Sequence, residues 1–145
     1  KTDKFTFRSS LGTSVVYNWK ITNGSSSFYE IQDCMKEFRE VRPYFYEDYY
    51  PLTGSGDITG DNIWMAYQLY RPSDKSGFVV AFRREACPDK THTVKLSGLD
   101  PDAVYSVTNK DTGETVSKSG LELAEGFVLT LDQPRSSLLL KYRAE

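Results

Sequence analysis

Two pairs of acidic residues that lie close together in the sequence are the first candidates for chemistry in this chain. Glu47 and Asp48 are adjacent, and adjacent side chains in an extended segment point to opposite sides, so they make a poor acid–base pair. Asp57 and Asp61 lie in a stretch rich in Gly and Asp that has the look of a calcium loop. Its spacing lacks the further oxygen ligands and the terminal Glu of an EF-hand. We interpret the first pair as solvated charge and the second as part of a surface loop, and we predict no metal site.

The single histidine and the two cysteines offer no better site. His92 lies on the polar face of an alternating segment, residues 91–94, so it is expected to be exposed. One histidine builds no His-based metal cluster, and no Gly-x-Ser-x-Gly motif marks a serine hydrolase. Cys34 and Cys87 are interpreted as two separate thiols, with one disulfide as the alternative. The chain is therefore predicted to hold no catalytic residue and no cofactor.

The segment 42–52 is the densest group of aromatic side chains. It holds five of them between two prolines: Tyr44, Phe45, Tyr46, Tyr49 and Tyr50. Aromatic faces stack on the apolar faces of pyranose rings, so one interpretation is a sugar-binding platform. The other interpretation is an interface between two structural units, which these rings would seal. We favour the interface, and a chain that exposed such a surface would be expected to self-associate.

The elements before this segment follow a strand-and-helix pattern. Residues 4–8 alternate apolar and polar side chains, and residues 14–21 are β-branched and aromatic, so both are predicted to be strands. Ser27 and Glu30 have the spacing of a capping box, and the apolar residues that follow recur on one helical face. Pro43 is expected to end this helix, because the residue before a proline is driven out of the helical region.

The elements after the segment are all predicted strands separated by turns. They are expected at residues 62–70, 77–84, 91–96, 103–108, 114–118, 127–131 and 136–142. Short strands at this spacing predict a mostly β fold, an antiparallel β-sandwich with Greek-key-like connections. Trp64 and Tyr67 are an odd number of residues apart, so they should point to opposite faces. We divide the chain into a strand–helix portion, 1–50, and a sandwich, 51–145.

Composition and charge exclude several classes of function. The 145 residues are 39% hydrophobic and 26% charged, and the net charge of −2 comes from interleaved acids and bases. This pattern lacks the basic face that nucleic-acid binding needs, and no apolar run approaches the length of a membrane helix. Residues 1–50 look too small to be a domain of their own. We therefore expect the chain to be the tail of a larger protein.

Several segments of the predicted sandwich resemble one family when they are taken together. Residues 96–107 (LSGLDPDAVYSV), followed by 111–114 (DTGE), are similar to the small C-terminal β-sandwich of α-galactosidase-like glycoside hydrolases of the melibiase type. Residues 64–68 (WMAYQ) and 81–84 (AFRR) look like the first two strands of that sandwich. No single motif is specific, and the resemblance rests on their order and spacing.

The resemblance extends into the first part of the chain. Residues 42–46 and 49–52 look like the segment by which such enzymes leave their (β/α)8 barrel, and residues 7–12 and 15–19 resemble the last part of that barrel. The resemblance thus implies an antiparallel sandwich preceded by a strand–helix segment left over from a catalytic barrel. Its partners would be the upstream barrel of the same polypeptide and, in the parent enzyme, a carbohydrate.

The resemblance also implies where catalysis would reside. Such enzymes are retaining hydrolases with two catalytic aspartates, and retention places two carboxyl groups about 5–5.5 Å apart. Those aspartates would lie upstream of Lys1, and no residue here matches either of them. Asn18 and Trp19, near the end of the predicted strand 14–21, would contact the sugar only within the parent barrel. The interface aromatics of segment 42–52 would then face that barrel.

Two further expectations concern location and the alternative function. Enzymes that degrade polysaccharides are often secreted, so an exported location, periplasmic or extracellular, is favoured for the parent. The alternative to an accessory domain is a free-standing carbohydrate-binding β-sandwich module, which would bind a glycan without chemistry. Neither interpretation gives this chain a catalytic role of its own.

Overall fold

The chain begins with a helix where the alternation of residues 4–8 predicts a strand. The structure is a computed structural model that describes residues 3–15, 27–54 and 59–145. Its first element is α1, Lys4–Ser9. Asp3 caps this helix, because its carboxylate accepts a hydrogen bond from the Thr6 backbone N–H at 2.9 Å. The strand prediction is wrong because this local cap and the burial of Phe7 and Arg8 outweigh the apolar alternation.

The amphipathic helix that the sequence predicts is present as α2, Ser27–Val41. It continues directly into the 3-10 helix η1, Arg42–Tyr46, so Pro43 ends the α-helix without ending the helical path. A proline is tolerated there because the first turn of a helix does not need its N–H. Most of the strand predicted at 14–21 lies outside the described residues. No helix in the described part of the chain is long and apolar enough to cross a membrane.

In the described part of the chain, eight antiparallel strands form two sheets. The larger sheet has the order β1-β2-β3-β8-β5-β6, and β4 and β7 pair separately. The strands are β1 Asp48–Pro51, β2 Trp64–Arg71, β3 Ser76–Arg83, β4 Thr91–Val94, β5 Val104–Asn109, β6 Thr115–Ser119, β7 Phe127–Thr130 and β8 Ser136–Ala144. Seven of them match the predicted strands to within a few residues, and the mostly β antiparallel sandwich is confirmed.

Two elements were not predicted. The strand β1 begins at Asp48, within the aromatic segment, and pairs with β2 as the edge of the larger sheet. The helix α3, Gly120–Glu125, precedes β7. Its signal is present in the sequence, because Ser119 and Glu122 form a capping box in which each side chain binds the other residue's backbone N–H.

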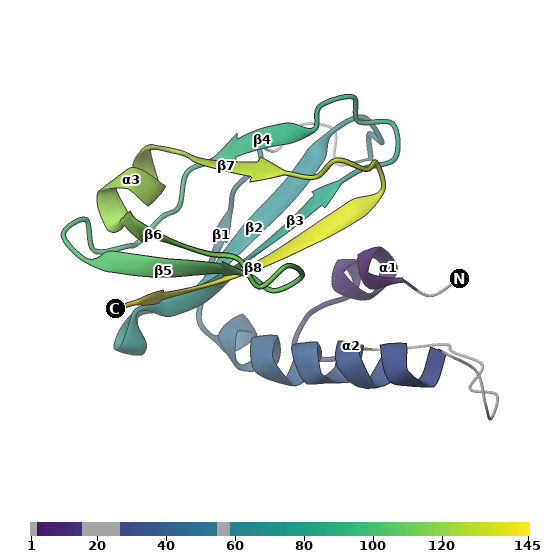
Figure 1. Cartoon of the computed structure of the whole chain (residues 1–145). Coiled ribbons are helices and arrows are strands. Elements are labelled where there is room, and N and C mark those ends of the chain that lie inside the picture. Colours follow the sequence, from purple (N-terminus) through teal and green to yellow (C-terminus); the bar gives the residue numbers. More distant parts are fainter. Residues whose placement is uncertain (1–2, 16–26, 55–58) are drawn as a thin grey trace.

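The elements form three layers, with the larger sheet in the middle (Figure 1). On one face lie α3 and the two-stranded sheet, and on the other face lie α1 and α2 (Figure 1). Each face of the larger sheet has its own apolar core. Trp64 belongs to the core on the β4–β7 side and Tyr67 packs on the helical side, which confirms that they point to opposite faces.

One glycine is required where β2, β3 and β8 meet. The Tyr142 hydroxyl donates a hydrogen bond to the Leu69 carbonyl at 2.8 Å and accepts one from the Gln68 amide at 2.9 Å. This hydroxyl lies against Gly77, where an added Cβ would overlap both the Tyr142 side chain and the Leu69 carbonyl. Because Gly77 has no side chain, the buried Tyr142 side chain can pass over β3, and its hydroxyl can reach β2 and complete its hydrogen bonds.

The variant Gly77→Ala should lower the free energy of unfolding by about 1–3 kcal/mol, because the new methyl group forces the buried Tyr142 and β2 apart. The matched control is Gly54→Ala, where nothing lies within 4 Å of the added Cβ. That control should change stability by less than about 0.5 kcal/mol. Urea unfolding followed by circular dichroism measures both, and equal effects of the two changes would contradict the packing described here.

Candidate functional site: an aromatic groove beside a buried arginine

The residues proposed from sequence for sugar contact cannot be placed. Asn18 and Trp19 lie outside the described residues, and so does Asp57. Glu47 and Asp48 are both exposed, as expected of solvated charge. Cys34 and Cys87 are buried and free, which confirms two separate thiols.

His92 differs from its expected exposure, because it is half-buried. Its ring stacks on Trp64 with 5.9 Å between centroids and 16° between planes. The indole N–H of Trp64 donates to the Asp89 carbonyl at 2.9 Å, which holds the indole where β4 crosses it. The expectation is therefore wrong for a tertiary reason, since a strand's polar face can be covered by a ring from another sheet. Within the described ranges, no three His, Cys, Asp or Glu residues gather in a way that could hold a metal ion.

The aromatic residues of segment 42–52 diverge to different surroundings. Tyr44 is buried under the sheet, Phe45 and Tyr49 line a groove on the same side, and Tyr46 is 66% exposed. Tyr50 instead packs on the opposite face, against the core on the β4–β7 side. The segment is thus not one flat platform, and only part of it remains accessible.

Tyr44 fixes η1 to the sheet. Its ring meets Phe78 edge to face at 4.9 Å, and its hydroxyl shares a hydrogen bond with the Ser76 hydroxyl at 2.8 Å. The Arg71 guanidinium donates to the same hydroxyl at 2.9 Å and lies 4.3 Å from the ring centroid. Arg71 also forms a bidentate pair with Asp74, and its hydrogen bonds hold the pKa of that carboxyl well below its usual value.

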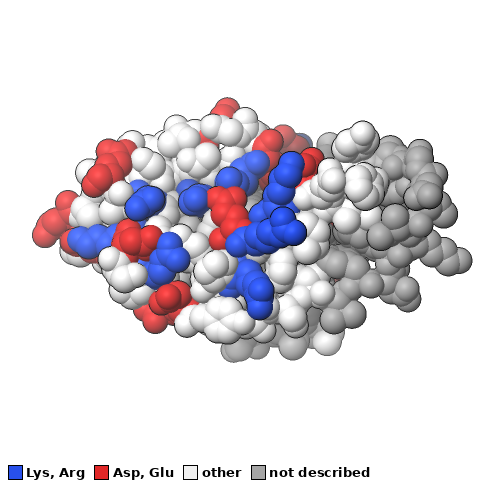
Figure 2. Space-filling model, turned by 90° about the horizontal axis from the view of Figure 1, so that it is seen from below, with Lys and Arg blue, Asp and Glu red and all other residues white. Residues whose placement is uncertain are grey.

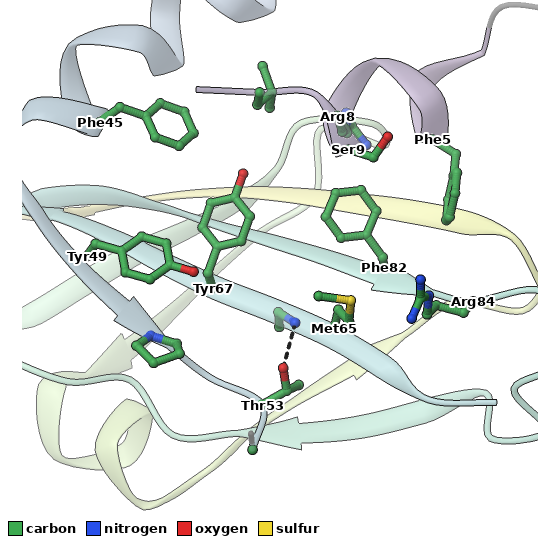
Figure 3. Close-up of a pocket in the computed structure, with 14 residues that line it drawn as sticks. Phe5, Arg8, Ser9, Phe45, Tyr49, Thr53, Met65, Tyr67, Phe82 and Arg84 are labelled. Carbon is green, nitrogen blue, oxygen red and sulfur yellow. Dashed lines mark hydrogen bonds between the residues drawn. The ribbon is translucent and has the colours of Figure 1, made fainter. Parts of the chain in front are cut away.

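A groove of about 740 Å³ opens between α1 and the η1–β1 segment (Figure 3). Met65, Tyr67 and Phe82 form its floor on β2 and β3. Phe5 of α1 stands at one wall and Phe45 of η1 at the other (Figure 3). The described lining holds no Asp or Glu, so the groove offers no carboxyl pair for acid–base chemistry. It can bind rings or apolar side chains.

Tyr67 is the polar centre of this groove. Its ring lies 5.5 Å from that of Tyr49 and 6.1 Å from that of Phe45. Its hydroxyl points into the space between Phe45 and α1 (Figure 3), and within the described ranges it makes no hydrogen bond. Burial, together with the neighbouring Tyr49, raises the pKa of Tyr67 above its usual value, so the hydroxyl stays protonated and can donate.

Arg8, beside the groove on α1, is the most deeply buried charged residue of the described chain. Its guanidinium forms bidentate hydrogen bonds with Glu37 of α2 at 2.7 and 3.0 Å and with Asp111 at 2.8 Å. It also reaches the Ser137 carbonyl and hydroxyl on β8, each at 3.3 Å. One side chain therefore connects both helices to the β5–β6 turn and to the central sheet. Nothing in the local pattern around Arg8 indicates this role, because its acidic partners lie 29 and 103 positions away.

Arg8 and its carboxylate partners stabilise one another's charged forms. Burial disfavours the guanidinium charge, but hydrogen bonds with Glu37 and Asp111 outweigh this and raise the pKa of Arg8. Burial likewise opposes ionisation of Asp111, but the hydrogen bonds from Arg8 lower the pKa of that carboxyl. The backbone N–H of Asp111 donates a hydrogen bond to the Asn109 side chain at 2.8 Å, and this bond stabilises the turn that carries Asp111. This local hydrogen bond helps to orient Asp111 toward Arg8.

A second group of ion pairs fastens α2 nearby. Glu40 accepts hydrogen bonds from Lys141 of β8 at 2.8 Å and from Lys110 of the β5–β6 turn at 3.3 Å. Although burial opposes this, the two lysines lower the pKa of Glu40. Figure 2 shows basic and acidic side chains side by side on the face seen there, with no broad area of one sign among the described residues. The helical layer is therefore held by specific ion pairs.

Comparisons with known proteins place this architecture. No protein-family model and no curated sequence matches the chain. Solved structures do match: the GH36 α-galactosidase AgaA of Geobacillus stearothermophilus superposes with a TM-score of 0.65, 18% identity and 86% of this chain covered. The α-galactosidase of Lactobacillus brevis superposes with a TM-score of 0.66 and 16% identity over 89% of this chain. The galactosidase domain of the α-galactosidase–sucrose kinase AgaSK superposes with a TM-score of 0.63 and 21% identity over 83% of this chain.

The chain has the fold of a segment of these α-galactosidases. This confirms, for the fold, the resemblance seen in the sequence. The match extends into the helical part, because residues 47–145 alone make up a smaller share of the chain than is covered. The chain spans only 16–18% of the length of these proteins. They are larger enzymes, and the matched segment is a small part of each.

The variant Arg8→Met should destabilise the chain by about 3 kcal/mol, because it leaves two partly buried carboxylates without their shared cation. The control Arg135→Met removes a more exposed ion pair with Asp3 and should cost far less. Chemical unfolding followed by tryptophan fluorescence measures both variants. If the two changes have the same effect, Arg8 is not the central connection of the helical layer.

The variant Asp111→Asn should lose stability in a pH-dependent way. The folded-state pKa of Asp111 lies below its unfolded value near 3.8, so its contribution is present above that value and disappears as the pH falls through the folded pKa. The difference in unfolding free energy between wild type and Asp111→Asn should therefore be largest near neutral pH and shrink in acid. The same difference should be small at every pH in an Arg8→Met background. A difference that does not vary with pH would contradict the pairing.

Proposed function

We propose that this chain is the C-terminal accessory portion of an α-galactosidase-like glycoside hydrolase. The observation that carries the proposal is the match of 83–89% of the chain to a segment of three α-galactosidases, of which it spans about a sixth. In this proposal residues 1–50 are the terminal part of a catalytic barrel, and residues 51–145 are a sandwich that supports it. The partner is the barrel of the same polypeptide, and the substrate of the whole protein is an α-galactoside.

The contacts of the helical layer support a structural role for the sandwich. Arg8 and Glu40, one on each helix, bind side chains of the β5–β6 turn and of β8. A barrel that ends in α1 and α2 would be held in register by these pairs, because a buried charge with specific partners allows only one docking position. The sandwich would thereby fix the last helices of the barrel and, through them, the barrel wall.

Catalysis in the parent would depend on residues outside this chain. Hydrolysis with retention needs a nucleophilic carboxylate and an acid–base carboxyl group about 5–5.5 Å apart. The described groove lining contains no carboxyl group. In this proposal the two catalytic aspartates belong to the upstream barrel, and the present chain contributes support alone.

The second candidate is a free-standing carbohydrate-binding module. The observation in its favour is the groove itself, in which Tyr49, Tyr67 and Phe45 present aromatic rings to one accessible space. Titration of the chain with galactose, melibiose and raffinose by calorimetry separates the two candidates. Saturable binding that Tyr67→Ala abolishes would favour the module, whereas the accessory role predicts no binding.

Purified chain should show no hydrolysis of an aryl α-galactoside, whereas the longer polypeptide read from the coding sequence upstream of Lys1 should hydrolyse it. The upstream sequence should contain strand–helix repeats with aspartates at strand ends. The assay measures release of the aryl alcohol under the same conditions for both proteins. Turnover by the 145-residue chain alone, or a start codon immediately upstream, would overturn the proposal.

A further inference from the structure

We propose that the aromatic groove binds a further amphipathic helix, which would lie beside α1 and α2. The preceding part of the larger polypeptide supplies this helix. This inference rests on the proposed function, and it assigns the groove a partner. The groove lies between α1 and η1 (Figure 3), on a part of the sheet face that the described helices leave open. Its floor is the same face of the sheet that α1, α2 and η1 cover elsewhere.

The floor has the character of a covered sheet face. Met65 and Tyr67 on β2 and Phe82 on β3 alternate with residues of the opposite core, as in a sheet that is packed on both sides. Elsewhere on this face Val41 and Tyr44 cover such residues completely, and Leu69 and Val80 have no exposed surface. The described helices do not cover Met65 and Tyr67 in this way, and both remain partly exposed. Layered domains bury such faces, so an element is expected there.

We infer that the missing element is a helix and not a strand, because its backbone hydrogen bonds must be satisfied on the face of the sheet. The groove lies on the face of the sheet, where the strand backbones are already paired with one another in the plane of the sheet. A single strand lying on this face would find no backbone partner in the sheet below and would need a second strand, as β4 needs β7 on the opposite face, whereas a helix satisfies its own N–H and C=O groups. The walls on both sides, α1 and η1, are helical as well. A helix that presents an apolar stripe and one acceptor for the Tyr67 hydroxyl would fit.

The larger polypeptide is a better source of this helix than a sugar or a second copy. A specific sugar site needs several polar side chains that orient hydroxyl groups. The lining does hold polar side chains, but each already has a hydrogen-bond partner within the chain: Arg8, Ser9, Thr53 and Arg84. The matched α-galactosidases continue for more than four fifths of their length outside the segment that this chain matches. The groove is bounded by α1, the element closest to that preceding chain in the sequence.

Oxidative footprinting of the 145-residue chain and of the longer polypeptide tests this assignment. Hydroxyl radicals should oxidise Met65 and Tyr49 readily in the 145-residue chain and several-fold more slowly in the longer polypeptide. His92 is the internal reference, because it lies on β4, on the opposite side of the larger sheet. Its oxidation rate should be the same in both proteins.

A matched pair of variants gives a second readout. Tyr49 and Tyr46 are 57% and 66% exposed, but only Tyr49 lines the groove. Tyr49→Asp should lower the melting temperature of the longer polypeptide more than Tyr46→Asp does, because it places a charge against the seated helix. In the 145-residue chain Tyr49→Asp already loses the contact of this ring with Tyr67, so the readout is how much the difference between the two variants grows from the 145-residue chain to the longer polypeptide. A difference of the same size in both proteins would contradict the inference.

The outcomes separate this inference from the proposed function. A longer polypeptide that hydrolyses α-galactosides while Met65 and Tyr49 stay equally reactive would overturn the groove assignment and leave the accessory role standing. Protection of these residues in an inactive longer polypeptide would support the groove assignment and refute the hydrolase. Protection that appears in the 145-residue chain as its concentration rises, or on addition of melibiose, would overturn the inference in favour of a second copy or a sugar.

Discussion

The ion cluster around Arg8 is the interaction on which the arrangement of this chain depends. A guanidinium whose side chain has no exposed surface is stable only if carboxylates neutralise it, and here one comes from α2 and the other from the β5–β6 turn. The helices therefore cannot leave the sheet without exposing a charge or leaving one buried without its partner. The pairs add direction to apolar packing, because bidentate hydrogen bonds require a particular orientation of the guanidinium and each carboxylate.

The same logic explains why the helical layer carries a gap. Tyr44 and its partners Arg71 and Ser76 fasten η1 at one side, and Arg8 fastens α1 at the other. The two attachments leave the sheet face between them uncovered, and the groove is the result. A domain that evolved to stand alone would be expected to fill such a gap with its own side chains. A surface left open but lined with aromatic rings suits a chain that continues into a larger assembly.

Sequence patterns predict the sheet well and the attachments poorly. Seven strands and α2 follow from alternation, turn residues and helical spacing, which are local properties. The helix α1 escapes prediction because Phe5 and Phe7 mimic a strand, and a cap at Asp3 decides the outcome. The role of Arg8 and the stacking of His92 on Trp64 depend on residues far apart in the chain, so no local pattern contains them. The capping box at Ser119 and Glu122 is different, because it is a local signal in the sequence although α3 was not predicted from it.

Native-state hydrogen exchange tests the central claim, that Arg8 makes the helical layer and the sheet one cooperative unit. The amides of α1 and α2 should exchange with the same opening free energy as those of β3 and β8, and Arg8→Met should lower the helical values first. If the helices of the wild-type chain exchange with a much smaller opening free energy than the sheet does, the two parts unfold independently. The account of a layer locked by one buried cation would then be contradicted.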